Sequence, residues 1–380
     1  MAESDRTGGI LTIDLGAVAA NWRLLRDRAA PAECAAVVKA DAYGLGMAEV
    51  APALAAAGCR VFFVATLDEG IRLRSVLSAR ATGAEFPPPA APTIFLLNGA
   101  PRGYEAELLQ YGLIPVLNGL ADVAAWGLLA SMLGATLPAA LQIDTGMSRL
   151  GLPPDELALL DGEPQRLEGT GVILLMSHLA CADDPAHELN RRQLDAFSAA
   201  RRSWPGVAGS LAASSGLFLG PDWCCEMVRP GAALYGVGPV PGSENPMRPV
   251  VRLTARVLQV RQIDSGAAVG YGATYRAGAP AVIATAAVGY ADGYLRALGN
   301  RGAGCLGGHR VPLVGRVSMD LITFDVTEVP SELVHPGAEI ELIGAASDVD
   351  AVATAAGTIG YEILTSLGKR YSRTYLSAQT

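Results

Sequence analysis

Residues 35–46 read AAVVKADAYGLG, a short apolar run that ends in Lys39 and passes into a turn containing two glycines. A continuous apolar run of this length is typical of a parallel strand that is buried on both faces. We therefore expect a strand here, with Lys39 at its carboxyl end, followed by a helix. Desolvation at that position would lower the pKa of the lysine and free its amine to form a Schiff base.

Seven further runs of the same kind follow, separated by stretches rich in Ala and Leu. They are 61–66 (VFFVAT), 93–99 (TIFLLNG), 113–118 (LIPVLN), 139–145 (AALQIDT), 172–179 (VILLMSHL), 210–215 (SLAASS) and 227–235 (MVRPGAALY). Eight strands that alternate with helices predict an α/β fold, namely a (β/α)8 TIM-type barrel over residues 11–240.

The pattern changes at residues 239–249 (PVPGSENPMRP), whose composition is typical of a linker. Residues 252–263 then alternate apolar and polar side chains, the period of a half-exposed antiparallel strand. We expect a C-terminal, mostly antiparallel β domain over residues 241–380, with which residues 1–10 could pack. Its further strand candidates are 281–288, 311–317, 321–326 and 339–343.

Composition excludes several classes of protein. The 380 residues are 51% hydrophobic and 17% charged, which excludes global disorder, and the net charge of −8 disfavours a nucleic-acid partner. Six cysteines without a CxxC pair indicate buried thiols in a reducing compartment, so we expect a cytoplasmic protein. The redox state of the adjacent pair Cys224 and Cys225 stays open.

One stretch, 123–142, lacks charge over about twenty residues and is long enough to cross a bilayer. It also contains Gly127, Gly134 and Pro138, which interrupt a membrane helix. We interpret it as an amphipathic helix, a turn and the start of a strand, and we expect no membrane association.

The active site of a TIM barrel lies at the carboxyl ends of its strands. Any single polar residue there is more often structural than functional, but several together raise the odds of a site. Gly231 and Ala232 lie in the second half of the last strand candidate, and with Ser215 they occupy the region where this fold commonly holds a phosphate. A lysine beside a phosphate cradle favours pyridoxal phosphate as cofactor, and we expect no metal. The other polar residues at these strand ends are Asp144, Arg149, His178, Ser214 and Arg229.

Seven motifs spread over nearly the whole chain resemble those of the alanine racemases, isomerases that depend on pyridoxal phosphate. The resemblance implies a barrel, a C-terminal β domain and a homodimer with shared active sites. It also implies conversion between L-alanine and D-alanine, with D-alanine supplied for peptidoglycan of the cell wall. The motifs are 36–46 (AVVKADAYGLG), 144–151 (DTGMSRLG), 177–183 (SHLACAD), 227–236 (MVRPGAALYG), 269–275 (VGYGATY), 288–294 (VGYADGY) and 315–320 (GRVSMD).

By position in these motifs, the resemblance implies a catalytic pair. Lys39 would hold the cofactor and act as the base that deprotonates the D-substrate, and Tyr271 of the partner subunit would deprotonate the L-substrate from the opposite face. His178 would lie near Tyr271, and Arg229 would lie between His178 and the ring nitrogen of the cofactor. Arginine stays charged, so that nitrogen would remain unprotonated.

The resemblance assigns the remaining site residues to three groups. The substrate carboxylate would meet Arg149 and the backbone N–H of Met319 from the partner subunit. The phosphate contacts would be Tyr43, Ser215, Tyr361 and the backbone N–H groups of Gly231 and Ala232. Supporting residues would be Gln142, Tyr290, Tyr294 and Asp320, with Tyr290 and Tyr294 either forming the wall of the entrance or packing the interface.

Three positions depart from the family pattern. Gln142 stands where many members have a carbamylated lysine that braces the arginine corresponding to Arg149, and an amide brings no negative charge. Ser318 replaces a common cysteine beside Met319, and 214–216 (SSG) replaces Asn-Ser-Ala. None of the three changes removes a catalytic residue.

Alternatives remain at this level. A serine-preferring or broad-specificity racemase would use the same residues, because the volume around the substrate side chain cannot be deduced from the motifs. A catabolic role is equally open. A decarboxylase of the same architecture is disfavoured because its His-Ile-Gly-Ser motif is missing, and a non-catalytic carrier of pyridoxal phosphate would lack the region after residue 250.

Overall fold

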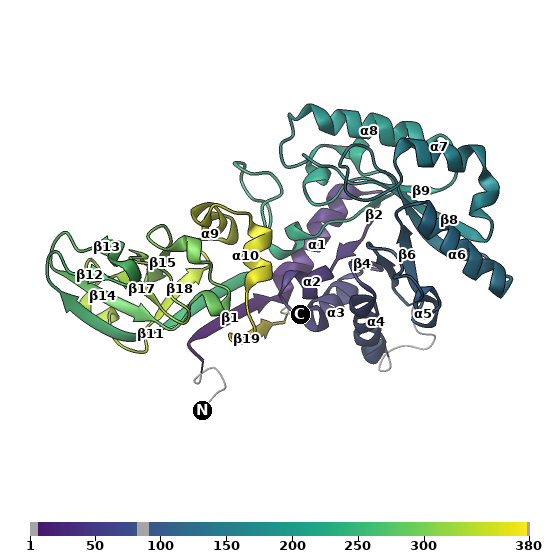
Figure 1. Ribbon diagram of the computed structural model, residues 1–380. Coiled ribbons are helices and arrows are strands. Elements are labelled where there is room, and N and C mark those ends of the chain that lie inside the picture. Colours follow the sequence, from purple (N-terminus) through teal and green to yellow (C-terminus); the bar gives the residue numbers. More distant parts are fainter. Residues whose placement is uncertain (1–6, 82–90, 378–380) are drawn as a thin grey trace.

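The computed structural model describes residues 7–81 and 91–377, which form a barrel joined to an elongated β domain (Figure 1). Seven parallel strands of the barrel pair in the order of the sequence, which confirms the expected α/β architecture. They are β3 (Ala36–Val37), β4 (Val61–Val64), β5 (Thr93–Leu96), β6 (Leu113–Leu117), β7 (Leu137–Gln142), β8 (Thr170–Met176) and β9 (Ala208–Ser210).

The eighth strand closes the ring. β10 (Met227–Val228) pairs in parallel with β2 (Glu33–Cys34), which lies one residue before β3. On the other side, a parallel bridge joins Ala213, which follows β9, to Arg229. Most side chains of these strands are buried and belong to one continuous apolar core, although Ile173 of β8 is exposed.

Helices cover the outside of the barrel (Figure 1). The α-helices are α1 (Leu15–Ala29), α2 (Lys39–Tyr43), α3 (Met47–Ala57), α4 (Leu67–Ala81), α5 (Glu105–Gln110), α6 (Leu120–Leu133), α7 (Pro154–Gly162) and α8 (Glu188–Arg201). The 3-10 helices are η2 (Pro164–Leu167), η3 (Ser215–Phe218), η4 (Pro221–Trp223) and η5 (Ala232–Tyr235).

The expected strands are too long at their carboxyl ends. β7, β8 and β9 end at Gln142, Met176 and Ser210, so Asp144, His178 and Ser214 lie in loops rather than in strands. The last strand candidate, 227–235, is shortened most and becomes β10 (Met227–Val228). Pro230 cannot donate a hydrogen bond to a ladder, and the chain then enters η5. Each correction moves a polar side chain from the barrel wall to its mouth.

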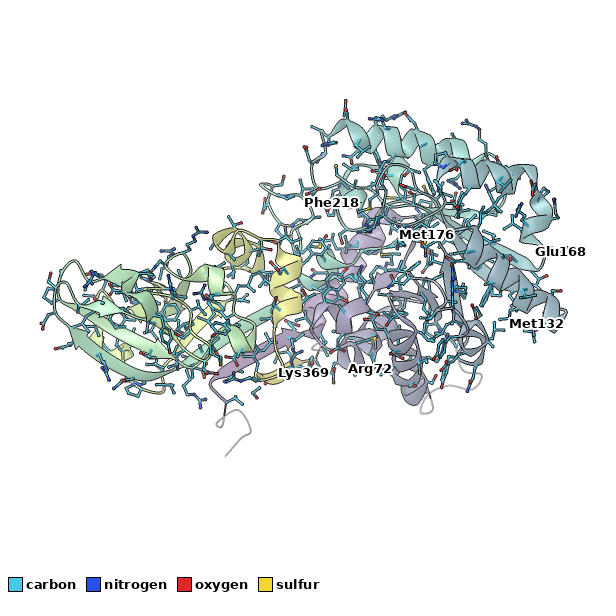
Figure 2. All side chains as sticks on the ribbon, viewed as in Figure 1. Arg72, Met132, Glu168, Met176, Phe218 and Lys369 are labelled. Carbon is cyan, nitrogen blue, oxygen red and sulfur yellow. The ribbon has the colours of Figure 1, made fainter. Side chains whose placement is uncertain are left out.

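The interpretation of residues 123–142 is correct except in one respect. α6, a turn and β7 occupy this stretch, but the outward face of α6 is apolar as well, with Leu128, Met132 and Leu133 exposed. Figure 2 shows Met132 at the outer end of this helix. In the described part of the chain, no helix has the length and apolar character needed to cross a membrane. All six cysteines are free thiols.

The β domain is built around β11 (Val251–Ile263), a long strand that takes part in two ladders. Its first half pairs with β1 (Gly9–Asp14) and β18 (Glu339–Ile343), and its second half pairs with β14 (Ala281–Ala286). The register shifts between Val257 and Gln259, where the strand passes from one ladder to the other. Except for the parallel pair of β1 with β19 (Ser372–Leu376), these ladders are antiparallel.

Shorter elements complete this domain. The strands are β12 (Ala268–Val269), β13 (Tyr275–Arg276), β15 (Ala303–Leu306), β16 (His309–Pro312) and β17 (Ile322–Asp325). The helices are α9 (Val349–Ala356), α10 (Gly360–Ser366), η6 (Tyr271–Ala273), η7 (Tyr290–Asp292), η8 (Arg296–Leu298) and η9 (Ser331–Leu333). The expected strand 311–317 is therefore displaced toward its amino end, because Val314 and Gly315 leave the ladder.

Candidate active site

Lys39 opens a turn of unusual backbone conformation. The four residues after it, Ala40 to Tyr43, have φ values between +53° and +55°, so α2 is a single left-handed turn. L-residues adopt this region at a cost of roughly 1–2 kcal/mol each, and such strain persists only where neighbouring groups impose it. The turn delivers Lys39 to the barrel mouth at the end of β3.

Glu69 at the start of α4 holds this turn in place. Its Oε1 accepts from the Ala40 N–H at 2.6 Å and its Oε2 from the Ala65 N–H at 2.8 Å. Glu69 was not among the predicted site residues, although Thr66-x-x-Glu69 is a capping-box pattern that marks a helix start. Thr66 and Glu69 do exchange the two capping bonds.

The surroundings of Lys39 favour its neutral amine. Partial burial lowers its pKa, the nearby cation Arg149 lowers it further, and Glu69 opposes them. The net direction is downward, as expected for a lysine that must offer a free amine.

The partly buried His178 and the buried Arg229 lie near each other, and His178 also lies close to this lysine. Burial, with Arg229 and Arg149 next in effect, lowers the pKa of His178 to about 3, so the imidazole is neutral at working pH. Burial also lowers the pKa of Arg229 to about 10, which leaves it charged. Its guanidinium donates to Ser210 Oγ and, at 2.6 Å, to the Ser177 carbonyl oxygen.

Gln193 of α8 fixes the backbone of the His178 loop. This fully buried amide donates to the His178 carbonyl oxygen at 2.8 Å and accepts from the Ala180 N–H at 2.8 Å. It also donates to Thr145 Oγ1 at 3.2 Å, which ties the His178 loop to the loop that carries Arg149. Gln193 was not predicted from the sequence, because a polar residue on a helix gives no sign of facing the barrel.

A cradle of hydroxyl groups lies beside the last two strands. Ser214 Oγ accepts from the Gly231 N–H at 3.0 Å and from the Ala233 N–H at 3.2 Å. A side chain at Gly231 would meet the Tyr43 hydroxyl at 2.2 Å, so this close approach requires glycine. The ring of Tyr43 lies 4.8 Å from that of Tyr235 and 6.1 Å from that of Tyr361.

A cleft of about 730 Å³ opens from this cradle toward the β domain. His178, Ser215 and Tyr361 line it, together with residues of α9 and of the linker after residue 237. Of the residues that the motifs assigned to cofactor binding, these three line the cleft, whereas Lys39 and Arg229 do not.

The loop that carries Arg149 begins in a tight turn around Asp144. Its Oδ1 accepts from the N–H groups of Gly146, Met147 and Ser148, and these bonds lower the carboxyl pKa although partial burial alone would raise it. Arg149 follows with an exposed side chain.

Gln142 acts on this loop through the backbone. It lies buried at the end of β7, and its Nε2 donates to the Leu150 carbonyl oxygen at 3.1 Å. The amide therefore braces the residue next to Arg149 rather than the guanidinium itself.

The residues expected from the β domain lie apart from this cluster. Tyr271 belongs to the segment β12–η6–β13, which forms the end of the β domain remote from the barrel (Figure 1). Its side chain is 72% exposed, and Met319 is 54% exposed. Tyr294 is buried with its hydroxyl unpaired, so it packs inside the domain and does not form a wall.

Comparison with known proteins agrees with this geometry. Models of the alanine racemase N-terminal and C-terminal domains match residues 13–239 and 250–375. An alanine racemase of Rhodospirillum rubrum is 51% identical over 99% of this chain and 98% of its own length, and a catabolic alanine racemase of Mesorhizobium japonicum is 48% identical over 97% and 93%. The crystal structure of alanine racemase from Bartonella henselae with covalently bound pyridoxal phosphate covers 97% of this chain and 99% of its own, with 43% identity and a TM-score of 0.91.

Proposed function

The chain belongs to the alanine racemase family, and from that premise we propose that it interconverts L-alanine and D-alanine with pyridoxal 5′-phosphate as its cofactor. The observation that carries the proposal is the cluster at the barrel mouth. There a lysine whose pKa is lowered lies near a buried arginine and a neutral histidine.

The residues present fit this cofactor. Arg229 is a buried cation, and no carboxylate of the described residues pairs with it, so it can donate to an uncharged ring nitrogen. Hydroxyl groups of Tyr43, Ser215 and Tyr361 and the N–H of Ala232 suit a phosphate. The Gly231 N–H donates to Ser214 Oγ, so a phosphate would share this donor with the serine, and the missing side chain of Gly231 also leaves room for Tyr43.

Two groups of the protein would handle the α-proton. When bound, pyridoxal phosphate supplies an electron sink that acidifies the α-carbon of the amino acid. Lys39 Nζ would take the proton from the D-enantiomer, and Oη of Tyr271 from the partner subunit would take it from the L-enantiomer. His178, neutral and held by its own loop, would donate a hydrogen bond to the tyrosine oxygen and stabilise its phenolate form.

The substrate carboxylate would be bound from both subunits. Arg149 carries an exposed, unpaired guanidinium near Lys39 in the described structure. The Met319 N–H makes no hydrogen bond within residues 7–81 and 91–377, so it is available to a carboxylate. A charged and a neutral donor that converge on one carboxylate fix its orientation.

Shared sites require a homodimer. Tyr271 lies at the far end of the β domain and cannot approach Lys39 of its own chain, whereas a two-fold partner can present it. The exposed Tyr271, Tyr290 and Met319 then become interface residues. We expect a dimer mass in light scattering, and a monomer with full activity would contradict this arrangement.

Racemisation is tested with the purified protein loaded with pyridoxal phosphate. L-alanine, L-serine and L-lysine are supplied separately, the products are separated by chiral chromatography, and Lys39→Ala serves as the control. We expect D-alanine as the main product. D-serine formed faster than D-alanine would favour the serine-preferring alternative, and no D-alanine above the control would refute the proposal.

We further propose a cytoplasmic, biosynthetic role in supplying D-alanine for peptidoglycan. Relatives named as catabolic exist at similar identity, so the two roles need a direct test. Deletion of the coding sequence should make growth depend on added D-alanine if the role is biosynthetic. If the deletion strain does not require D-alanine but no longer grows with alanine as its sole carbon and nitrogen source, the role is catabolic.

A further inference from the structure

The C-terminal segment from α10 to β19 contacts two distant parts of the fold. It begins with Tyr361 at the cofactor cradle and ends with β19 beside β1. Figure 2 shows Lys369, in the middle of the segment, near the place where the two domains meet. Two arginines of the segment, Arg370 and Arg373, point to different targets.

Arg373 holds the turn that carries Lys39 of its own subunit. Its guanidinium donates to the Gly44 carbonyl oxygen at 2.7 Å, and Tyr375 Oη donates to the Leu45 carbonyl oxygen at 3.0 Å. The space beside Gly44 is filled by the Leu364 carbonyl oxygen, which lies 2.6 Å from where a Cβ would be. The cofactor turn is therefore packed against this segment.

Arg370 reaches the exposed loops of the β domain instead. Its Nε lies 3.1 Å from Oδ1 of Asp292, and another guanidinium nitrogen lies 2.8 Å from Oδ1 of Asp320. The Asp292 side chain is only 7% exposed and its Oδ2 accepts from the Gly289 N–H at 2.8 Å, so loss of Arg370 would strand a buried carboxylate. Asp320 is half exposed and has its partner only in Arg370 among the described ion pairs.

The two carboxylates lie in two segments that are joined by backbone hydrogen bonds, namely η7 with Asp292 and the loop before β17 with Asp320. The N–H of Tyr290 donates to the Ser318 carbonyl oxygen at 3.0 Å, and the N–H of Ala291 donates to the Met319 carbonyl oxygen at 2.9 Å. Arg370 bridges the residues that follow this pair, Asp292 after Ala291 and Asp320 after Met319. It therefore adds a side-chain link to the backbone hydrogen bonds that join the Tyr290 loop and the Met319 loop.

We propose that Arg370 is a positioning residue for the active site of the partner subunit, because it fixes the loop that presents the Met319 N–H. Arg373, three residues later, acts on the site of its own subunit. The inference rests on the proposed function, since it requires that Met319 serve the partner. A displacement of about 1 Å in such a donor can cost a large factor in turnover or affinity.

Hybrid dimers separate the two directions. A subunit with Lys39→Ala is combined with a subunit that keeps Lys39, and holo hybrids are isolated through two affinity tags. Each hybrid has one competent site, built from the barrel of the Lys39 subunit and from Tyr271 and Met319 of the other. A reference hybrid of Lys39→Ala with Tyr271→Phe checks the shared site itself, since one of its sites is intact.

Arg370→Ala is then placed on either subunit. On the Lys39→Ala subunit it should raise the KM for alanine about tenfold with kcat changed less than about threefold, and on the Lys39 subunit it should change neither. Arg373→Ala should impair activity when it is placed on the Lys39 subunit and should have no effect when it is placed on the Lys39→Ala subunit. Arg252→Ala removes an ion pair of similar exposure to Glu341 and should have no effect from either subunit.

A second readout does not depend on turnover. Calorimetric binding of propionate, a carboxylate without an amine, should weaken about tenfold in the same hybrid that shows the raised KM. If Arg370→Ala fails to fold, Asp320→Asn keeps the pair with Asp292 and should give a smaller effect in the same direction. Equal effects of Arg370→Ala from both subunits, or none, would overturn the inference, whereas an inactive reference hybrid would overturn the shared site instead.

Discussion

Lys39 shows how a single side chain is prepared for its chemistry. Three influences act on its amine, namely partial burial, the cation Arg149 and the carboxylate Glu69. The first two lower the pKa, and the third both opposes them and anchors the turn through the Ala40 N–H. Reactivity and position thus depend on the same small group of neighbours.

His178 predicts a pH dependence of stability. Its pKa is about 3 in the folded protein and about 6.5 when unfolded, so between these values the unfolded chain binds a proton that the folded chain excludes. Stability should therefore fall as the pH drops through this window. In His178→Asn, the free energy of unfolding in urea should decline less between about pH 7.5 and pH 4.5 than in the wild type. An equal decline would show that His178 is not held neutral.

The hydrogen bond of Gln142 predicts that its loss affects the KM for alanine more than kcat. Its amide holds the Leu150 carbonyl oxygen beside Arg149, so its removal should loosen carboxylate binding more than the proton transfer. We expect Gln142→Ala to raise the KM for alanine about fivefold with kcat changed less than about twofold. Gln165→Ala, at an exposed position in η2, is the control. A fall in kcat without a rise in KM would assign Gln142 to the transition state.

The sequence was most informative for residues that follow strands. The position of Lys39, His178, Ser215 and Arg229 near the barrel mouth could be predicted because the carboxyl ends of barrel strands converge there, whereas their roles stay predictions. Gln193 and Arg370 could not, since each acts through tertiary contacts with segments far along the chain.

At the scale of elements, local propensity did not predict the left-handed turn after Lys39. Alanine is the best former of right-handed helices, yet Ala40 and Ala42 adopt positive φ. The carboxylate of Glu69 and the contacts with α10 impose this conformation. Strand ends were also misplaced, because the apolar runs continue past the last ladder hydrogen bond into buried loops.

Ser214 predicts a stability contribution from the start of η5. Its Oγ caps two backbone N–H groups, and in Ser214→Ala both would remain buried without a partner. We expect the cofactor-free protein to lose about 1–3 kcal/mol of unfolding free energy in urea titration. Ser75→Ala, which removes an exposed bond to the Ile71 carbonyl oxygen, should change it by less than about 0.5 kcal/mol. Equal losses in both variants would show that the cap is not stabilising.

On the scale of the whole molecule, the two domains share their chain ends. We keep 11–240 and 241–380 as the proposed domain limits, although β1 (Gly9–Asp14) pairs with strands of the β domain, so residues 11–14 belong to its sheet. The expected packing of residues 1–10 with the β domain agrees with the pairing of Gly9 and Ile10 with β11, but the partner strands and the extension to Asp14 could not be predicted, because they join segments hundreds of residues apart. This pairing couples the barrel and the β domain, each of which would serve a different active site of the dimer.

Isotope exchange tests the central claim, that Lys39 and Tyr271 of the partner subunit act on opposite faces of the substrate. Tyr271→Phe is incubated in deuterated water with L-alanine or with D-alanine, and deuterium at the α-carbon is followed by mass spectrometry after chiral separation. Because Lys39 remains, D-alanine should gain deuterium while little L-alanine forms, and L-alanine should stay unlabelled. Labelling of both enantiomers at equal rates would contradict the two-base account.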